Sequence, residues 1–234
     1  MKAGFLLSFV IVCLSVSAES PGVFPDTIVE HYCVASRNQE EVLKAASMDV
    51  EISGSLPKLK KQGRLHALRH ISSLGRITYE MLRFEGDNTV KKEVIARYLT
   101  AESEAQHSPS LGVTPENYKF KYKGARQLDG RDVHLFEVSP KQKRQGLFKG
   151  QIWIDAATYL RVQESGYLVK SPSLAIRKVV FVRKYEIRDG LSVPRQVQSV
   201  TDTWLVGKAE LTIDYTNFSI DGRKQSVAGD TDGQ

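Results

Sequence analysis

The spacing of apolar residues changes several times along the chain, and each spacing predicts a type of secondary structure. From about residue 26 to residue 47 the apolar positions recur with the period of a helix, which predicts two short helices or one kinked helix. The period then changes to two, which predicts three successive strands. The residues that share one face of these strands are Met48, Val50 and Ile52 in the first, Leu65, Ala67, Arg69 and Ile71 in the second, and Ile77, Tyr79 and Met81 in the third.

A further helix is predicted at residues 91–106, where helical spacing returns after a Gly-Asp-Asn break. Its apolar stripe has the width expected of a helix that packs against a sheet. The side chains of this stripe are Val90, Val94, Ile95, Tyr98 and Leu99.

Nearly all of the chain after residue 118 alternates between apolar and polar residues, which predicts about seven more strands. In the first of them Tyr118, Phe120 and Tyr122 alternate with three lysines, a pattern typical of a half-buried strand. Turn signals around residues 129–130, 156–157 and 189–190 divide the segment into hairpins. In the last strand Leu211, Ile213 and Tyr215 share one face.

About ten strands with short connections predict an antiparallel sheet, and a sheet of that length must curl or close. The helices are too few to cover both faces, but they can cover the opening of a curled sheet. The fold class is therefore expected to be mainly β, within α+β. It would be a curled antiparallel sheet that forms an unclosed half-barrel, with a helical lid over an apolar cavity. Residues 26–220 are expected to form this single domain.

The first residues have the pattern of a secretory signal. Lys2 is followed by an apolar run from Gly4 to Leu14 and then by Ser17 and Ala18, the small residues of a cleavage site. The apolar run is shorter than the roughly 20 residues that span a bilayer. We therefore expect a signal peptide at residues 1–18, a linker at 19–25, a flexible polar tail at 221–234 and a periplasmic location.

The chain carries 33 Lys and Arg residues against 27 Asp and Glu residues, a formal charge of +6. The excess is spread over three basic groups, which lie at residues 58–64, 141–149 and 177–188. An exported protein is not expected to bind nucleic acid. Anionic surfaces of the cell envelope and acidic ligands are candidate partners, beside the alternative that these groups are solvated strand faces and loops.

The sequence holds no glycine-rich phosphate loop and no Gly-x-Ser-x-Gly motif. His66 and His70 are four residues apart, but on a strand they would lie about 13 Å apart, too far to share one metal ion. Cys33 is expected to be a small buried hydrophobe rather than a nucleophile. We expect no catalytic residues, no metal and no cofactor, and hence a protein that is not an enzyme.

Two segments resemble the LolA-like family of periplasmic lipoprotein-sorting proteins, which includes the lipoprotein carriers. In the first, from Gly150 to Val162, a strand ends at Asp155 and turns through Ala-Ala-Thr before it re-enters the sheet. In the second, from Tyr185 to Pro194, a hairpin turns at Asp-Gly. The resemblance implies an unclosed barrel with a helical lid and a hydrophobic cavity that carries acyl chains. It also implies an inward strand arginine that latches the lid, for which Arg69 and Arg83 are the candidates.

The expected function is a periplasmic carrier or binder of lipoprotein acyl chains or lipids. The alternative is a periplasmic sensor or regulatory module on the same fold, which acts through protein contacts and fills the cavity with aromatic side chains. The expected partners are lipoproteins or lipid acyl chains, together with envelope membrane proteins, and the chain is expected to be a monomer. The ligand-binding residues would be Arg69, Arg83, Tyr79, Met81, Ile95, Tyr98, Tyr118, Phe120, Tyr122, Leu211, Ile213 and Tyr215.

Export makes a direct prediction about the mature N-terminus. Signal peptidase reads small residues before the cleaved bond, and Ala18 is the last small residue of the pattern. N-terminal sequencing of the protein from the periplasmic fraction should therefore begin at Glu19. A full-length product that stays in the cytoplasm would show that the segment is not a signal.

Overall fold

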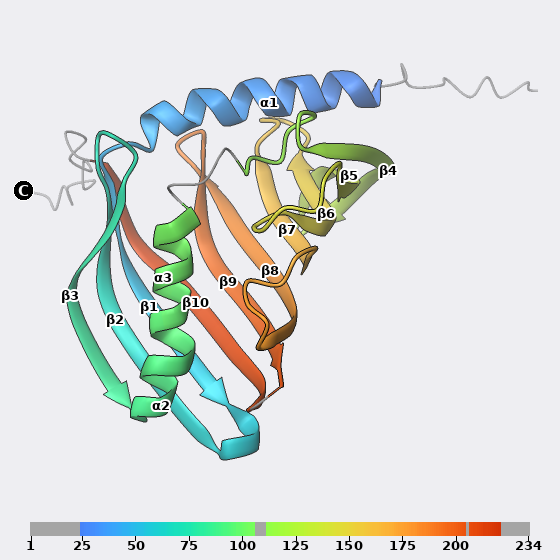
Figure 1. Cartoon of the computed structure of the whole chain (residues 1–234). Coiled ribbons are helices and arrows are strands. Elements are labelled where there is room, and N and C mark those ends of the chain that lie inside the picture. The colour runs from blue at the N-terminus through green and yellow to red at the C-terminus, as the bar shows by residue number, and fades with distance from the viewer. Residues whose placement is uncertain (1–23, 106–110, 205, 221–234) are drawn as a thin grey trace, which may run out of the picture.

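A computed structural model describes residues 24–105, 111–204 and 206–220, within which ten strands form one antiparallel sheet (Figure 1). The expected signal peptide, most of the linker and the polar tail lie outside the described residues. The strands are β1 (Ala46–Leu56), β2 (Lys61–Ile71), β3 (Ile77–Gly86), β4 (Tyr118–Leu128), β5 (Arg131–Pro140), β6 (Phe148–Asp155), β7 (Arg161–Leu168), β8 (Ile176–Arg188), β9 (Leu191–Thr203) and β10 (Gly207–Ile220).

The order of the strands in the sheet is β3-β2-β1-β10-β9-β8-β7-β6-β5-β4, so β3 and β4 are its two edges and the sheet is not closed. The first strand pairs with the last, with Ile52 opposite Ile213. The remaining neighbours follow one another in sequence as hairpins. The predicted fold class, a mainly β half-barrel that stays open and carries few helices, is confirmed.

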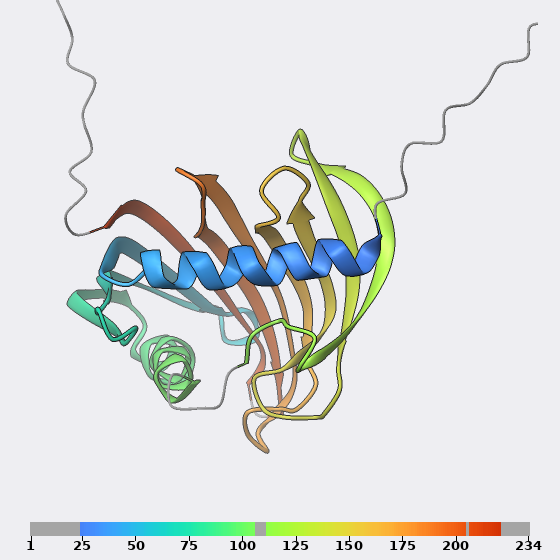
Figure 2. The same ribbon diagram turned by 90° about the horizontal axis from the view of Figure 1, so that it is seen from above.

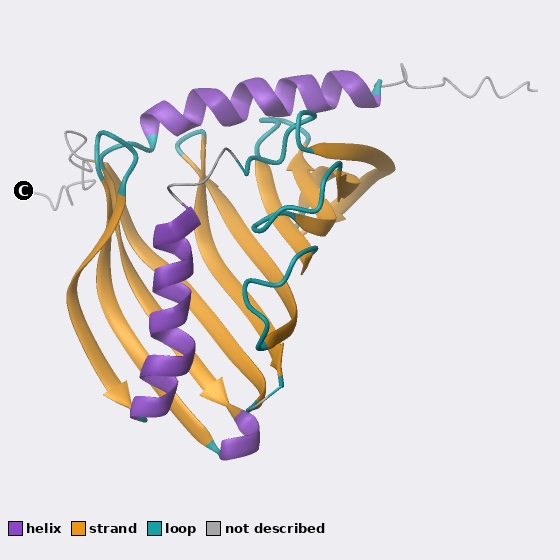
Figure 3. Ribbon diagram, viewed as in Figure 1, coloured by secondary structure: helices purple, strands orange, loops and turns teal. Residues whose placement is uncertain are grey.

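Two long helical segments accompany the sheet (Figure 3). The first, α1 (Pro25–Val42), is one helix rather than two, and it ends before Ala45, whose φ of 65° turns the chain into β1. Residues 46 and 47, which the sequence assigned to the helix, belong to β1. The second segment joins α2 (Asn88–Val90), the π-helical turn η2 (Lys91–Ile95) and α3 (Ala96–Ala105), and is called the lid helix below. A short 3₁₀ turn, η1 (Pro57–Leu59), connects β1 to β2.

Each helical segment covers a different part of the concave face, and two apolar clusters result. Seen from above, α1 crosses one end of the half-barrel, whereas the lid helix lies over the half that contains β1 and β2 (Figure 2). The cluster between α1 and the sheet joins four residues of α1 to side chains of the strands beneath it. The α1 residues are Ile28, Val29, Tyr32 and Cys33, and the strand residues are Tyr118, Phe136, Phe148, Ile152, Ile154 and Phe181. The cluster between the lid helix and the sheet joins Val90, Val94 and Ile95 of the helix to side chains of β1, β2 and β10. The strand residues are Met48, Val50, Ile52, Leu56, Leu65, Ala209, Leu211 and Ile213. Among the described residues, no helix is both long enough and apolar enough to cross a membrane.

The lid helix lies close to β1 because a glycine faces it. A Cβ atom at Gly54 would lie 3.0 Å from the Cγ1 atom of Val90 and 3.2 Å from that of Val94. Such distances are shorter than ordinary van der Waals contacts, so any larger residue would push the helix away from the strand. The helix therefore packs with its valines and Ile95 directly on the backbone of β1.

A bulge between β2 and β3 changes which residues of β3 face the helix. His66 pairs with Arg83 and Leu68 pairs with Glu80, so two residues of β3, Met81 and Leu82, stand opposite the single Ala67 of β2. This adds one residue to β3, and Met81 has a φ of 51°. The alternation therefore slips at this point. Tyr79 lies on the helix side, but Met81 is 67% exposed and lies with Arg83 on the opposite side of the sheet. The phase predicted from the sequence for Met81 and Arg83 is thus wrong.

Removing apolar contact under the lid helix should destabilise the whole domain. Ile95 is fully buried among side chains of β1, β2 and β10, so Ile95→Ala would leave a cavity and should lower the free energy of unfolding by about 2–5 kcal/mol. Chemical denaturation followed by circular dichroism measures this change. The matched control is Arg97→Ala on the exposed face of the same helix, which should cost less than about 0.5 kcal/mol. Equal effects of the two variants would show that the helix does not pack as described.

Candidate ligand-binding site

An apolar hollow of about 240 Å³ lies between the lid helix and the β2–β3 edge of the sheet. We call it the edge hollow. Because β3 is an edge strand, no further strand borders the hollow on that side. Apart from the Lys91 side chain, every residue that lines it is apolar: Leu65, Leu82, Phe84, Ile95, Ala96 and Leu99. An apolar concavity between a helix and a sheet is a typical place for an apolar ligand.

An arginine on β2 holds the far part of the lid helix. Arg69 is only 8% exposed, and its Nη2 atom lies 3.4 Å from Oε1 of Glu102 on α3. The hydroxyl of Tyr79 on β3 donates a hydrogen bond to the other oxygen of Glu102. Two strands therefore bind one carboxylate of the helix. The group Arg69, Tyr79 and Glu102 is called the lid latch.

Arg69 and Tyr79 of the lid latch keep their protons despite their burial. Burial alone would lower the pKa of Arg69, but the carboxylate of Glu102 and the surrounding tyrosines raise it above the usual value. Burial and Glu102 also raise the pKa of Tyr79, so its phenol stays protonated and remains a donor. Next to the latch, the hydroxyl of Tyr98 on the helix donates to Tyr215 on β10. Opening the lid helix would therefore break an ion pair and at least two hydrogen bonds.

The structure divides the ligand residues expected from the sequence into three groups. Arg69, Tyr79, Ile95, Tyr98, Leu211, Ile213 and Tyr215 lie at or beneath the lid helix. Tyr118, Phe120 and Tyr122 lie instead in the cluster under α1, so movement of the lid helix alone would not expose them. Met81 and Arg83 lie on the opposite side of the sheet. The ligand-binding role of all these residues stays a prediction.

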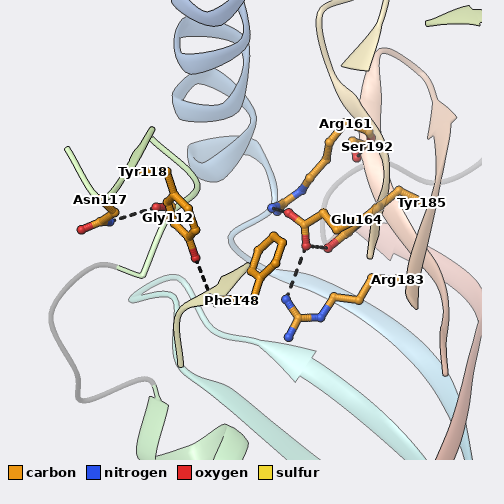
Figure 4. Close-up of polar contacts among 9 residues, drawn as sticks. All are labelled: Gly112, Asn117, Tyr118, Phe148, Arg161, Glu164, Arg183, Tyr185 and Ser192. Carbon is orange, nitrogen blue, oxygen red and sulfur yellow. Dashed lines mark hydrogen bonds and ion pairs between the residues drawn. The ribbon is translucent and has the colours of Figure 1, made fainter. Parts of the chain in front are cut away.

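A second buried polar group lies beneath α1 and has no counterpart among the residues expected from the sequence (Figure 4). Glu164 on β7 is 1% exposed, and it lies 2.9 Å from Arg161 Nη1 and 3.4 Å from Arg183 Nη1. The hydroxyl of Tyr185 donates to the same carboxylate at 3.3 Å, and the Arg161 guanidinium stacks over the Tyr185 ring at 4.7 Å. These four residues form the ion cluster.

The ion cluster combines one carboxylate with two guanidinium groups, so it carries an excess positive charge. Burial raises the pKa of Glu164, but Arg161 and Arg183 outweigh this effect and hold the pKa below its ordinary value. Burial raises the pKa of Tyr185 to about 12, although Arg161 opposes the rise. The Arg183 side chain is 41% exposed, so this positive charge remains accessible to water. Among the described residues, the buried Nε atoms of Arg69 and Arg161 have no hydrogen-bond partner.

The backbone explains why this cluster forms. The register between β6 and β7 shifts after the pair Trp153–Gln163, and Arg161 pairs directly with Ile154. Arg161 and Glu164, three residues apart, can therefore contact each other on the same side of the sheet. The sequence contains one signal of this arrangement, because Glu164 is in phase with the apolar residue Val162. The bulge that adds Arg161 to the group has no such signal.

A larger hollow of about 510 Å³ lies on the other side of the sheet and has a different chemistry. Asp49, Glu51 and Asp214 line it, together with His66 and Arg83. All three carboxylates already have partners, since Arg64 lies 3.1 Å from Glu51, Gln196 donates to Asp214 at 2.6 Å and Asn217 donates to Asp49 at 2.7 Å. Val50, Ala67, Leu68 and Met81 also line this hollow, so it mixes charged and apolar groups, whereas the edge hollow has one charged side chain.

Cys33, the residue weighed as a nucleophile, and Asp155, at the end of β6, have structural roles in the described part of the chain. Cys33 is buried in the cluster under α1, and Asp155 Oδ1 accepts hydrogen bonds from three groups of the Ala157–Thr158 turn. Within the described residues, no group of three or more His, Cys, Asp or Glu side chains is placed to hold a metal ion. The geometry offers a place for an apolar ligand and nearby positive charge.

Comparisons with known proteins concern the fold. No known protein family matches the sequence, and no curated protein matches it. Similar solved structures include a DUF1329 family protein from Desulfovibrio piger, with 15% identity, coverage of 84% of this chain and 95% of that chain, and a TM-score of 0.44. An outer membrane lipoprotein-sorting protein domain from Vibrio parahaemolyticus has 13% identity, coverage of 86% and 95%, and a TM-score of 0.42. A LolA superfamily protein from Nitrosomonas europaea has 10% identity, coverage of 87% and 96%, and a TM-score of 0.36.

These names agree with the resemblance seen in the sequence. With TM-scores below 0.5 and identities of 15% or less, they do not assign a ligand to this chain. The function therefore has to be argued from the geometry of the chain itself.

The ion cluster predicts a stability difference that depends on pH. Glu164→Gln would remove the negative charge and leave Arg161 and Arg183 facing each other, which should cost about 3 kcal/mol at pH 7. The folded-state pKa of Glu164 is below its ordinary value of 4.5, so the stabilisation is present above pH 4.5 and is lost as the pH falls through the folded pKa. The difference in the free energy of unfolding between wild type and variant should therefore become smaller in acid. Urea titrations at several pH values measure this difference.

The control for this experiment is Glu93→Gln, which removes the carboxylate of a more exposed pair with Arg97 at 2.8 Å. That change should lower the free energy of unfolding by less than about 0.5 kcal/mol at any pH. A gap between wild type and Glu164→Gln that is independent of pH would contradict the ionised state assigned to Glu164.

Proposed function

We propose that the chain binds acyl chains of lipoproteins or lipids without catalysis, between the lid helix and the sheet. The observation that carries this proposal is the edge hollow, an apolar space that borders an edge strand and a helix held by a polar latch. The buried side chains beneath the helix extend this apolar surface from β2 to β10. Movement of one helix would therefore expose a continuous apolar surface.

The size of the edge hollow sets how binding would proceed. Pockets that enclose a small-molecule ligand usually measure about 300–1,000 Å³. At about 240 Å³, the edge hollow would admit part of an acyl chain, and the lid helix would have to move to admit the rest. Each buried CH₂ group contributes about 0.8 kcal/mol, so a chain of about 14 carbons gains about 10 kcal/mol before the costs of association. This gain exceeds what the latch and its hydrogen bonds contribute.

The latch would couple ligand entry to a polar contact. Arg69 and Tyr79 stay on the sheet when Glu102 leaves with the helix, so the guanidinium and the phenol would face the entering molecule. A carbonyl or phosphate oxygen of a lipid could accept hydrogen bonds from both. Under this proposal the chain works in the periplasm as a monomer, and its partners are lipoproteins, lipids and the envelope proteins that exchange them.

The second candidate function is a sensor or regulatory module that acts through protein contacts. The half of the half-barrel under α1 favours it, because aromatic side chains fill that half. The Tyr118, Phe136, Phe148 and Phe181 rings pack there, and Phe148 contacts Phe181 at a centroid distance of 5.1 Å. A filled interior leaves no room for a ligand beneath α1. The two functions therefore differ in whether the edge hollow takes up a chain.

Filling the edge hollow should abolish binding. Ala96 lines the hollow on the lid helix, so Ala96→Phe would place an aromatic ring in the space that an acyl chain needs. We expect a fluorescent fatty acid to bind the wild type saturably, with affinity rising up to about tenfold for each two added CH₂ groups. The variant should bind at least about tenfold more weakly in the same fluorescence titration.

The matched control is Ala101→Phe, which adds the same ring at an exposed position of the same helix. It should leave the affinity unchanged, and both variants should unfold at similar denaturant concentrations. If the wild type shows no saturable binding at any chain length, the carrier proposal fails and the sensor function stands.

A further inference from the structure

Three turns meet at the end of the sheet that lies away from α1 (Figure 1). They are η1 with Lys60, the loop between β7 and β8 at residues 169–175, and the described residues 204, 206 and 207 between β9 and β10. The backbone N–H of Trp204 donates to the carbonyl of Ala175 at 3.1 Å, which joins the second turn to the third. A Cβ atom at Gly207 would lie 3.4 Å from Cδ of Lys58, which places the first turn beside the third. We call this group of turns the distal rim.

Each turn of the distal rim presents a large apolar side chain to water. Leu174 is 99% exposed, Trp204 is 68% exposed and Leu59 is 42% exposed. None of the three belongs to either apolar cluster of the fold. Exposed side chains of this size at neighbouring turn tips are costly to hydrate, which points to a partner that removes them from water.

Basic residues surround these three side chains. The rim and the strand ends beside it carry Lys58, Lys60, Lys170, Arg177, Lys178 and Lys208, and all six are exposed. Three acidic residues lie at the same strand ends, and each has a partner: Asp202 Oδ1 pairs with Arg177 Nη2 at 2.6 Å, Asp87 lies 3.4 Å from Lys61 Nζ, and Glu210 accepts a hydrogen bond from the Ser55 hydroxyl. The basic residues outnumber them. The Arg177 guanidinium also lies over the Trp204 ring, 4.9 Å from its centroid. The distal rim therefore has apolar tips within a positive field.

We propose that the distal rim docks the protein on an anionic bilayer surface. Tryptophan is favoured at the interface between headgroups and acyl chains, where its ring is amphipathic. Leucine tips can insert to the same depth, and lysine and arginine side chains can extend to the phosphates above them. Each basic residue near such a surface adds attraction that salt weakens. The distal rim combines all three features in one place.

A bilayer fits the rim better than a protein partner does. A stable protein interface buries about 800 Å² on each side as one contiguous, complementary surface. The apolar residues of the rim stand instead on three separate turns, and basic residues lie between them. Side chains spaced in this way enter a fluid surface independently. This inference concerns membrane docking and holds whether or not the edge hollow carries a ligand.

The test uses the intrinsic fluorescence of Trp204. The chain has two tryptophans, so Trp153→Phe leaves Trp204 as the single reporter. Titration with vesicles of phosphatidylglycerol should shift its emission to the blue, and phosphatidylcholine vesicles should give no shift. Raising the salt concentration should reverse the shift. Equal binding to both vesicles, or binding to neither, would overturn the proposal.

Sedimentation with the same phosphatidylglycerol vesicles tests the residues separately. The double variant Leu174→Ser, Trp204→Ser and the double variant Lys58→Glu, Lys60→Glu should each lower the partition coefficient by about tenfold or more. The control is Leu74→Ser, which removes an 89% exposed leucine from the β2–β3 turn at the other end of the strands. It should bind like the wild type. Unfolding curves show that each variant is folded, and an equal loss with Leu74→Ser would refute the assignment to the rim.

Discussion

The concave face of one open sheet is the constraint on which the rest of this structure depends. Because β1 pairs with β10, the ten strands form a single sheet whose edges, β3 and β4, do not meet. The concave face would be left in water unless another element covered it. Two helical segments from different parts of the chain do so, and each forms its own apolar cluster with the strands beneath it. The lid helix also connects the two edges of the sheet, since it lies between β3 and β4 in the chain.

Charged groups inside the half-barrel lie where the two helices meet the sheet. The lid latch binds the lid helix through Glu102, and the ion cluster lies beneath α1. The two differ in whether the helix contributes a residue to the charged group. Glu102 belongs to the lid helix itself, so the latch breaks when that helix moves. All four residues of the ion cluster belong to β7 and β8, whereas α1 is fixed separately through Gln39, which accepts a hydrogen bond from the backbone N–H of Ser192. Displacing the lid helix would therefore separate the members of the latch, whereas displacing α1 would leave the ion cluster intact on the sheet.

Alternation along the chain was enough to predict the strands, the open sheet and the helix that covers it. It succeeded because each strand has one buried face, as with Val50 and Ile52, so the period of two is visible in the sequence. It failed where a bulge changed the phase. Met81 follows Tyr79 by two residues but lies on the opposite side of the sheet, and Arg83 goes with it. The ion cluster was missed for the same reason, because the register shift in β7 brings Arg161 and Glu164 together. Bulges depend on pairing between strands, which no local pattern records.

The same bulge in β3 has a consequence for solubility. A sheet with two free edges offers rows of unpaired backbone groups to which a strand of another molecule can add, the first step of aggregation. At β3 the left-handed residue Met81 interrupts that row, and charged residues such as Arg83 and Glu85 flank it. At β4 the register shifts at Gly124, and Lys119, Lys121 and Lys123 alternate along the edge. Two misaligned and charged edges give the chain a built-in barrier against strand exchange with its own copies. The half-barrel can therefore stay open while both of its free edges resist the strand addition that leads to polymerisation.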